Sequence, residues 1–87
     1  MAIEESTIKQ LIEKAIPDAE VDIAGDGSHF QARVVSPAFD GIRAVKKQQM
    51  VYAALADQIA DGSIHALTIK AYTPEEWASA SKLQVTS

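Results

Sequence analysis

The sequence contains no cysteine and no long hydrophobic run. Without cysteine the chain can form no disulfide, supply no thiolate to a metal and use no thiol as a nucleophile. No apolar stretch approaches the roughly 18 residues that a membrane-spanning helix needs. The acidic start, with Glu4 and Glu5, lacks the basic and apolar regions of a signal peptide. We therefore expect a cytoplasmic protein that does not enter a membrane.

Positive charge is also scarce. Lys and Arg number 8 against 12 Asp and Glu, which gives a net charge of −4. Domains that bind nucleic acid through bulk electrostatics are usually basic, so only a local cluster of cations can support such binding here. Arg43, Lys46 and Lys47 form one such cluster. They are either a solvated surface or a contact for a DNA backbone or for an acidic protein partner.

The length of 87 residues predicts a single domain over 1–87, with an ordered core at about 6–82 and a frayed tail at 84–87. An amphipathic helix is predicted first, with Ser6 as its N-cap and Pro17 beyond its end. Its apolar stripe consists of Ile8, Leu11, Ile12, Ala15 and Ile16. Two alternating runs, 19–23 and 30–34, flank a turn at 25–28 and predict an antiparallel hairpin.

A second helix is predicted over 43–59, where helix-forming residues are frequent. Its expected inner side consists of Val45, Tyr52, Ala56 and Ile59, widened by Val51 and Leu55. A third strand follows over 64–72. The last helix, 74–82, begins with the pattern of a capping box, in which Thr73 is the N-cap and Glu76 the N3 residue. Tyr72 and Trp77 occupy the positions of a hydrophobic staple.

The predicted order is therefore α-β-β-α-β-α. The second strand, the long helix and the third strand form a crossover unit, which places those two strands parallel in one sheet. The first two strands are antiparallel, so the sheet is mixed and three-stranded, and helices must cover at least one of its faces. These features predict an α+β fold of KH-like appearance.

Two histidines are the clearest candidates for chemistry. His29 lies at the mouth of the predicted hairpin, and His65 opens the third strand, on the side of Leu67 and Ile69. A histidine in either place is commonly solvated or bonded to a backbone carbonyl, but imidazole also binds metals and changes charge near neutral pH. Structural zinc and iron–sulfur sites usually have four ligands, so two imidazoles make half a site. A partner must then supply the rest.

No catalytic set is recognisable. There is no cysteine nucleophile, and neither Ser28 nor Ser36 lies in a strand-turn-helix elbow. Glu75 and Glu76 are explained by helix capping. We therefore expect a protein that is not an enzyme.

Four segments together resemble the BolA family. They are Val34–Gly41 (VVSPAFDG), Val45–Tyr52 (VKKQQMVY), Ile64–Leu67 (IHAL) and Tyr72–Trp77 (YTPEEW). The resemblance covers nearly the whole chain, in the family's order and spacing. Gly25–Gln31 and Lys47–Gln49 are similar to the IbaG-type bacterial branch in particular.

The resemblance implies a KH-like (class II) fold and partnership with a monothiol glutaredoxin in handling a [2Fe–2S] cluster. In that family the histidine of the His-Ala-Leu segment is the shared cluster ligand, which corresponds to His65. The second ligand comes from the hairpin loop, which corresponds to His29. The glutaredoxin and its glutathione would supply the sulfur ligands, and the chain alone would hold no cofactor tightly. Without a bound partner, the chain is expected to be a monomer or a weak homodimer.

The sequence also permits other functions. Family members are often described as DNA-binding transcription regulators in stress responses, a role that Arg43, Lys46 and Lys47 could serve. Many of them carry Arg-His where this chain has Lys47-Gln48, which removes a histidine from that surface. In an acid-response role, histidine protonation would instead release a bound metal or partner.

Overall fold

The computed structural model describes residues 3–25 and 29–85. In chain order the elements are α1 (Glu5–Ala15), β1 (Glu20–Gly25), β2 (His29–Val35), the short 3-10 helix η1 (Pro37–Phe39), α2 (Ala44–Ala54), α3 (Ala56–Ala60), β3 (Ala66–Tyr72) and α4 (Pro74–Val85). None of the helices in this part of the chain has both the length and the apolar character that crossing a membrane requires.

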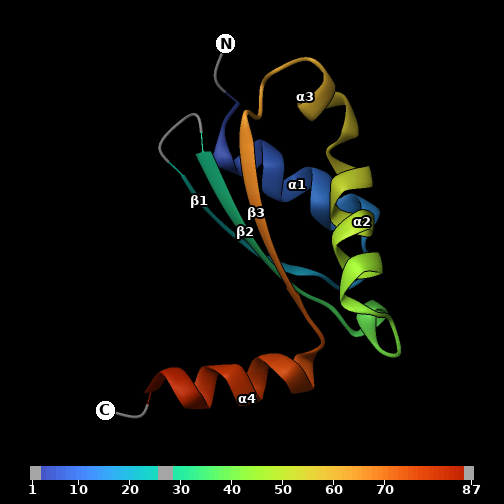
Figure 1. The fold of residues 1–87 in the computed structure, drawn as a ribbon, viewed down its shortest axis with the longest axis vertical. Coiled ribbons are helices and arrows are strands. Elements are labelled where there is room, and N and C mark those ends of the chain that lie inside the picture. Colours follow the sequence, from blue (N-terminus) through green and yellow to red (C-terminus); the bar gives the residue numbers. More distant parts are fainter. Residues whose placement is uncertain (1–2, 26–28, 86–87) are drawn as a thin grey trace.

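The three strands form one mixed sheet in the order β1-β2-β3 (Figure 1). β1 and β2 pair antiparallel, with Gly25 opposite Phe30. β2 and β3 pair parallel, with His29 opposite Ala66 and Val35 opposite Tyr72. The predicted α+β class, the hairpin and the parallel second pair are confirmed.

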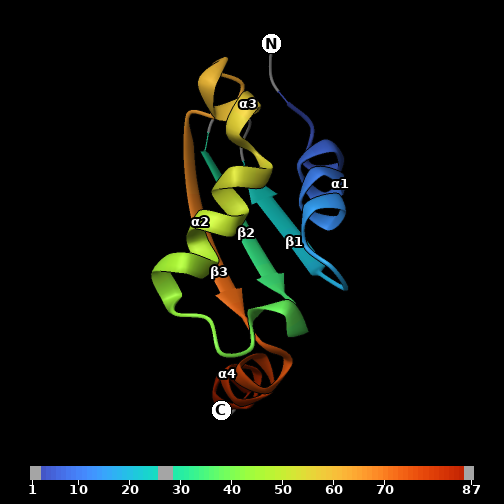
Figure 2. The ribbon, with the colours of Figure 1, turned by 90° about the vertical axis from the view of Figure 1, so that its right-hand side faces the viewer.

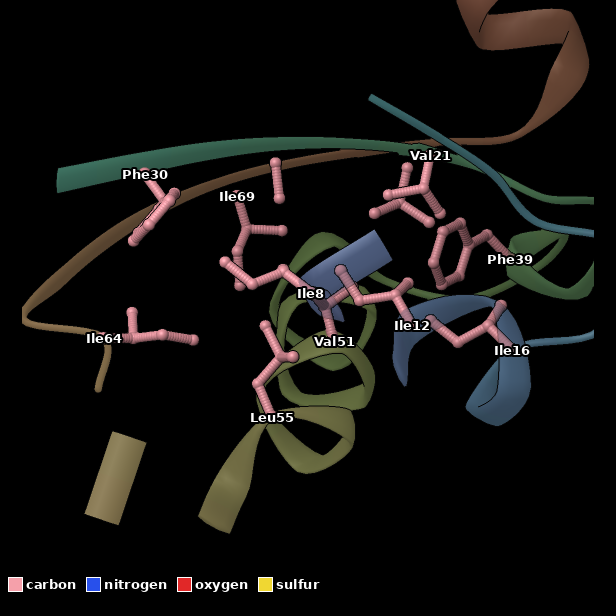
Figure 3. Packing of buried hydrophobic residues seen from close by; sticks show 12 residues of the cluster. Ile8, Ile12, Ile16, Val21, Phe30, Phe39, Val51, Leu55, Ile64 and Ile69 are labelled. Carbon is pink, nitrogen blue, oxygen red and sulfur yellow. The ribbon is translucent and has the colours of Figure 1, made fainter. Parts of the chain in front are cut away.

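Helices α1 and α2 lie on the same side of the sheet, and neither covers its other face (Figure 1 and Figure 2). Along β2 the buried residues Phe30, Ala32 and Val34 alternate with Gln31 and Arg33, as expected for a strand with one face in the core. The core cluster fills the space between this face and the helices (Figure 3); its members are Ile8, Ile12, Ile16, Val21, Phe30, Ala32, Val34, Phe39, Val51, Leu55, Ile64 and Ile69.

The side chain of Ser36 joins the end of β2 to the connection between α1 and β1. Its Oγ donates a hydrogen bond to the carbonyl of Pro17 at 2.6 Å and accepts one from the backbone N–H of Ala38 at 3.0 Å. Ser36 is completely buried, so these bonds satisfy a hydroxyl group that water does not reach. The second bond caps η1, whose last residue is the buried Phe39.

The first helix differs from the prediction at its start. It begins at Glu5 with Glu4 as the N-cap residue, and no side chain caps it, so the assignment of Ser6 as N-cap is wrong. Its end at Ala15 agrees with the helix-ending effect of Pro17.

The predicted long helix is two helices. α2 ends at Ala54 and α3 begins at Ala56, and Leu55 between them has φ −115° and ψ 16°, outside the helical region. The predicted inner side is correct for Val51 and Leu55, which are completely buried, and wrong for the residues that are 69%, 42% and 37% exposed, namely Val45, Tyr52 and Ile59. Lys47, which was not predicted to be buried, faces the core together with Val51 and Leu55. This set has the spacing i, i+4, i+8 of a single helical face.

The start of α4 confirms the predicted capping box. The Oε1 of Glu76 accepts from the backbone N–H of Thr73 at 2.8 Å, and the Oγ1 of Thr73 accepts from the backbone N–H of Glu76 at 3.1 Å. The ring centroids of Tyr72 and Trp77 lie 5.4 Å apart, so the two rings pack together as a hydrophobic staple requires. α4 continues to Val85, three residues beyond the predicted end. Residues 86–87 of the predicted tail lie outside the described residues.

Candidate functional site

The two histidines lie at the same end of neighbouring strands. His29 is the first residue of β2 and pairs in register with Ala66, the first residue of β3. His65 immediately precedes Ala66, so the parallel pairing of the two strands brings together residues that are distant in sequence. Both histidines are exposed. We call this pair the histidine edge. It lies at the end of the sheet away from α4 (Figure 1).

His65 does not lie within β3 as predicted. The strand begins one residue later, at Ala66, and His65 occupies a bend that follows the buried Ile64. Strand alternation does not extend to a residue outside the strand, so the placement of His65 on the side of Leu67 and Ile69 stays a prediction. The bend leaves the His65 imidazole exposed, where a docking molecule can reach it.

The histidine edge provides two nitrogen donors. Within residues 3–25 and 29–85 no group of three or more His, Cys, Asp or Glu side chains is placed to hold a metal ion. Residues 26–28 of the predicted turn lie outside the described part of the chain. The donor set thus fits one half of a four-ligand iron–sulfur or zinc site.

Gly25 controls how closely β1 approaches the start of β2. A Cβ at this position would lie 2.5 Å from Cδ1 of Phe30 and 2.7 Å from the backbone oxygen of His29. Cβ atoms in proteins essentially never come this close to non-bonded neighbours. Glycine is therefore required at position 25, because a side chain there would collide with the ring of Phe30 and with the backbone of His29.

Replacing Gly25 with alanine is expected to lower the free energy of unfolding by about 1–3 kcal/mol, because the added methyl group overpacks the end of the hairpin. The backbone resonances of His29 should shift in the same variant. Denaturant unfolding and amide NMR spectra measure the two effects. Ala24→Ser, at an exposed neighbouring position, serves as the control and should change neither. Wild-type stability and spectra for Gly25→Ala would show that the hairpin accommodates a Cβ.

The structure divides the predicted basic cluster. Arg43 is the N-cap residue of α2 and Lys46 lies in its first turn, and both are exposed. Lys47 is only 6% exposed, and its Nζ donates a hydrogen bond to Oε1 of Glu76 at 2.6 Å. Its charge is therefore paired with that of the half-exposed Glu76, and the pair ties α2 to the capping box of α4. Arg43 and Lys46 remain available to a partner.

This ion pair affects the titration of Glu76. The hydrogen bond from Lys47, helped by the one from the backbone N–H of Thr73, holds the pKa of the Glu76 carboxyl below its ordinary value. A carboxyl with a lowered pKa in the folded state stabilises the fold above the pKa of the unfolded chain. That contribution disappears as the pH falls through the folded-state pKa.

We therefore expect Glu76→Gln to have a lower Tm than the wild type at pH 7, and the difference to shrink as the pH falls below about 4. Glutamine keeps the capping geometry, so the variant isolates the charge. Glu75→Gln, an exposed glutamate in the same turn, is the matched control. Thermal unfolding followed by circular dichroism between pH 3 and pH 7 is the measurement. An equal difference at both ends of this range would exclude the ion pair as its cause.

Sequence reasoning did not single out Arg33, which organises the open face of the sheet. Its guanidinium lies 4.1 Å from the centroid of the Trp77 ring and forms an ion pair with Asp22. A cavity of about 310 Å³ adjoins these side chains, bordered also by Lys70 and Tyr72. The alternation of β2 placed Arg33 on this face, but the contact with Trp77 depends on α4, far along the chain. Arg33 thus anchors α4 to the sheet.

Comparison with known proteins agrees with this architecture. The family model described as BolA-like protein matches residues 5–76. The acid stress protein IbaG of Escherichia coli (strain K12) is 51% identical over 81 residues, which cover 93% of this chain and 96% of that protein.

Solved structures give the same result. A bolA protein homologue from Coxiella burnetii superposes with a TM-score of 0.76 at 39% identity, covering 87% of this chain and 97% of the other. The BolA domain of SufE1 from Arabidopsis thaliana superposes with a TM-score of 0.74 at 32% identity, covering 86% and 99%. The predicted resemblance is confirmed, and the chain belongs to the BolA family.

Proposed function

We propose that this protein is a non-enzymatic adaptor that pairs with a monothiol glutaredoxin and shares a [2Fe–2S] cluster with it through His65 and His29. The observation that supports this best is the parallel register of β2 and β3, which puts both imidazoles at one exposed end of the sheet. An adaptor needs its ligands where another molecule can dock on them. The histidine edge meets that requirement.

The incomplete donor set is the second support. A [2Fe–2S] cluster takes four protein-type ligands, and imidazole can replace thiolate in two of these positions. The chain has no cysteine and offers two exposed histidines, so the remaining ligands must be sulfur atoms of the partner. A cluster with mixed nitrogen and sulfur ligands has a higher reduction potential than an all-thiolate cluster. In this proposal the cluster is cargo that the pair holds or passes on.

A link to stress responses is part of the same proposal. It is supported by the similarity to a protein named for acid stress, and by the occurrence of a BolA domain in a protein named SufE1. The alternative of a DNA-binding regulator depends on fewer cations than the sequence suggested, because Lys47 is engaged with Glu76. Arg43 and Lys46 alone would have to make the phosphate contacts, and binding of that kind falls steeply with salt.

A titration tests the proposal directly. The apo-protein is added to a monothiol glutaredoxin loaded with a [2Fe–2S] cluster and glutathione, and followed by visible absorption, circular dichroism and sedimentation. We expect a heterodimer whose visible spectrum differs from that of the loaded glutaredoxin. Ferrous iron added to the apo-protein alone should bind weakly, because two neutral imidazoles are too few. If neither a complex nor a spectral change is seen, the proposed function is wrong.

A further inference from the structure

Three charged residues lie in register across the face of the sheet opposite α1 and α2 (Figure 1). Asp22 of β1 pairs with Arg33 of β2, and Arg33 pairs with Lys70 of β3. Because Ala32 and Ile69, the residues that precede Arg33 and Lys70, are buried in the core, Arg33 and Lys70 project from the other face. There Arg33 forms its ion pair with Asp22. We call Asp22, Arg33 and Lys70 the charged row.

The charged row contains two cations and one carboxylate. Like charges directly opposite each other on neighbouring strands weaken a sheet. Asp22 pairs with Arg33, whereas Lys70 forms no ion pair with any residue whose side chain the structure describes. The side chain of Arg33 is mostly buried, and its Nη1 makes no hydrogen bond to a described residue. Since a buried donor usually has an acceptor, the charged row is suited to a further anion.

The cavity of about 310 Å³ places aromatic rings beside the two cations. Tyr72 and Trp77 border this cavity together with the charged row, at the corner where β3 leads into α4. The indole of Trp77 is held by the guanidinium of Arg33, 4.1 Å from its centroid, and by the ring of Tyr72. The volume is at the lower end of the range for small-molecule sites. The cavity therefore combines unpaired positive charge with a fixed aromatic wall.

We propose that this cavity binds a small oxyanion that carries an aromatic ring, either a phosphate ester or a carboxylate. The anionic group would lie between Arg33 and Lys70, because a guanidinium matches the oxygens of phosphate and carboxylate and an ammonium adds a point charge. The ring would lie against Tyr72 and Trp77, where aromatic surfaces attract each other. The histidine edge provides no part of this site, so the proposal goes beyond the function proposed above.

The only tryptophan of the chain lies in this cavity, so its fluorescence and its single indole N–H NMR signal report binding there. Phenyl phosphate and benzoate are the probes, at constant ionic strength. Inorganic phosphate, without a ring, and phenol, without the charge, are the matched comparisons. We expect saturable changes with at least one probe at concentrations about tenfold lower than with either comparison, and the better probe identifies the oxyanion. Equal responses to all four compounds, or none, would overturn the proposal.

Two charge variants test the charged row itself. Lys70→Gln should weaken binding of the better probe about tenfold, because it removes an exposed cation that contacts the anion. Lys9→Gln removes the same charge from an exposed position on α1 and should leave the affinity unchanged. Asp22→Asn should strengthen binding severalfold, because it frees Arg33 from a competing carboxylate. A general defect in folding would not produce this opposite sign.

Equal affinities of Lys70→Gln and Lys9→Gln, or weaker binding by Asp22→Asn, would exclude the charged row as the site. His65→Ala should bind the probe as the wild type does. This variant separates the cavity from the function proposed above, because either site can then fail without the other.

Discussion

Replacing His65 with alanine is expected to abolish the spectral change that the wild-type protein produces with a cluster-loaded glutaredoxin. His65 is exposed in the bend before β3, so the substitution removes a donor without disturbing the core. With His29 as the only remaining imidazole, one of the four ligand positions on the cluster would have no protein group. Visible circular dichroism of the mixture is the measurement, because it reports the ligands directly. His29→Ala should weaken the same signal.

Three comparisons separate a ligand from a residue that merely contacts the partner. Thr68→Ala changes an exposed side chain further along β3 and should leave the spectrum unchanged. His65→Cys and His29→Cys each restore a donor, as sulfur, and should give a cluster with a spectrum distinct from the wild type. If His65→Ala retains the wild-type spectrum, His65 is not a ligand. If His65→Cys behaves like alanine, the role of His65 is contact alone.

The histidine edge shows how far the sequence can predict the candidate site. Alternation and turn residues placed His29 next to a hairpin, and the crossover unit made β2 and β3 parallel neighbours. Those two inferences suffice to bring His29 and His65 to one end of the sheet. The exact start of β3 was not predictable, because the run from Ile64 continues the apolar pattern of the strand. The structure begins β3 one residue after His65, which therefore lies in an exposed bend and not within the strand.

The outward face of α2 could not have been predicted from local pattern. Val45 and Tyr52 are apolar and Lys47 is charged, so periodicity favours burial of the wrong side. The structure buries Lys47 because Glu76, on a helix far along the chain, accepts its hydrogen bond, and its aliphatic stem can pack in the core. The break at Leu55 has a similar origin. Leu55 is completely buried, whereas no residue of α3 is, so packing rather than helix propensity separates the two helices.

The exposure of Val45, Tyr52 and Ile59 was missed for the same reason. The core itself was predicted more reliably. The stripe of α1 and the alternation of β2 both show one apolar side with an evident period, and both pack as expected in Ile8, Ile12, Phe30 and Val34. Phe39 was not predicted, because it lies in an irregular link without a period.

Phe39→Ala is expected to destabilise the fold by about 3–5 kcal/mol, a large part of the 5–15 kcal/mol typical of a small domain. Phe39 is the largest of the completely buried side chains. Its ring packs at the end of the core that contains Ile12, Ile16 and Val21 (Figure 3). The hydrogen bonds of Ser36 hold this segment in place, so the surrounding residues cannot easily close the cavity.

Denaturant unfolding of Phe39→Ala measures this loss, and Val45→Ala provides the matched control. Val45 is 69% exposed, so its truncation should change the free energy of unfolding by less than about 0.5 kcal/mol. Equal effects at the two positions would mean that the assignment of buried and exposed faces is wrong. Phe39 lies beyond the end of β2 that is opposite His29. The fraction of Phe39→Ala that remains folded should therefore still give the wild-type spectral change with a cluster-loaded glutaredoxin, since the histidine edge needs only the pairing of β2 with β3.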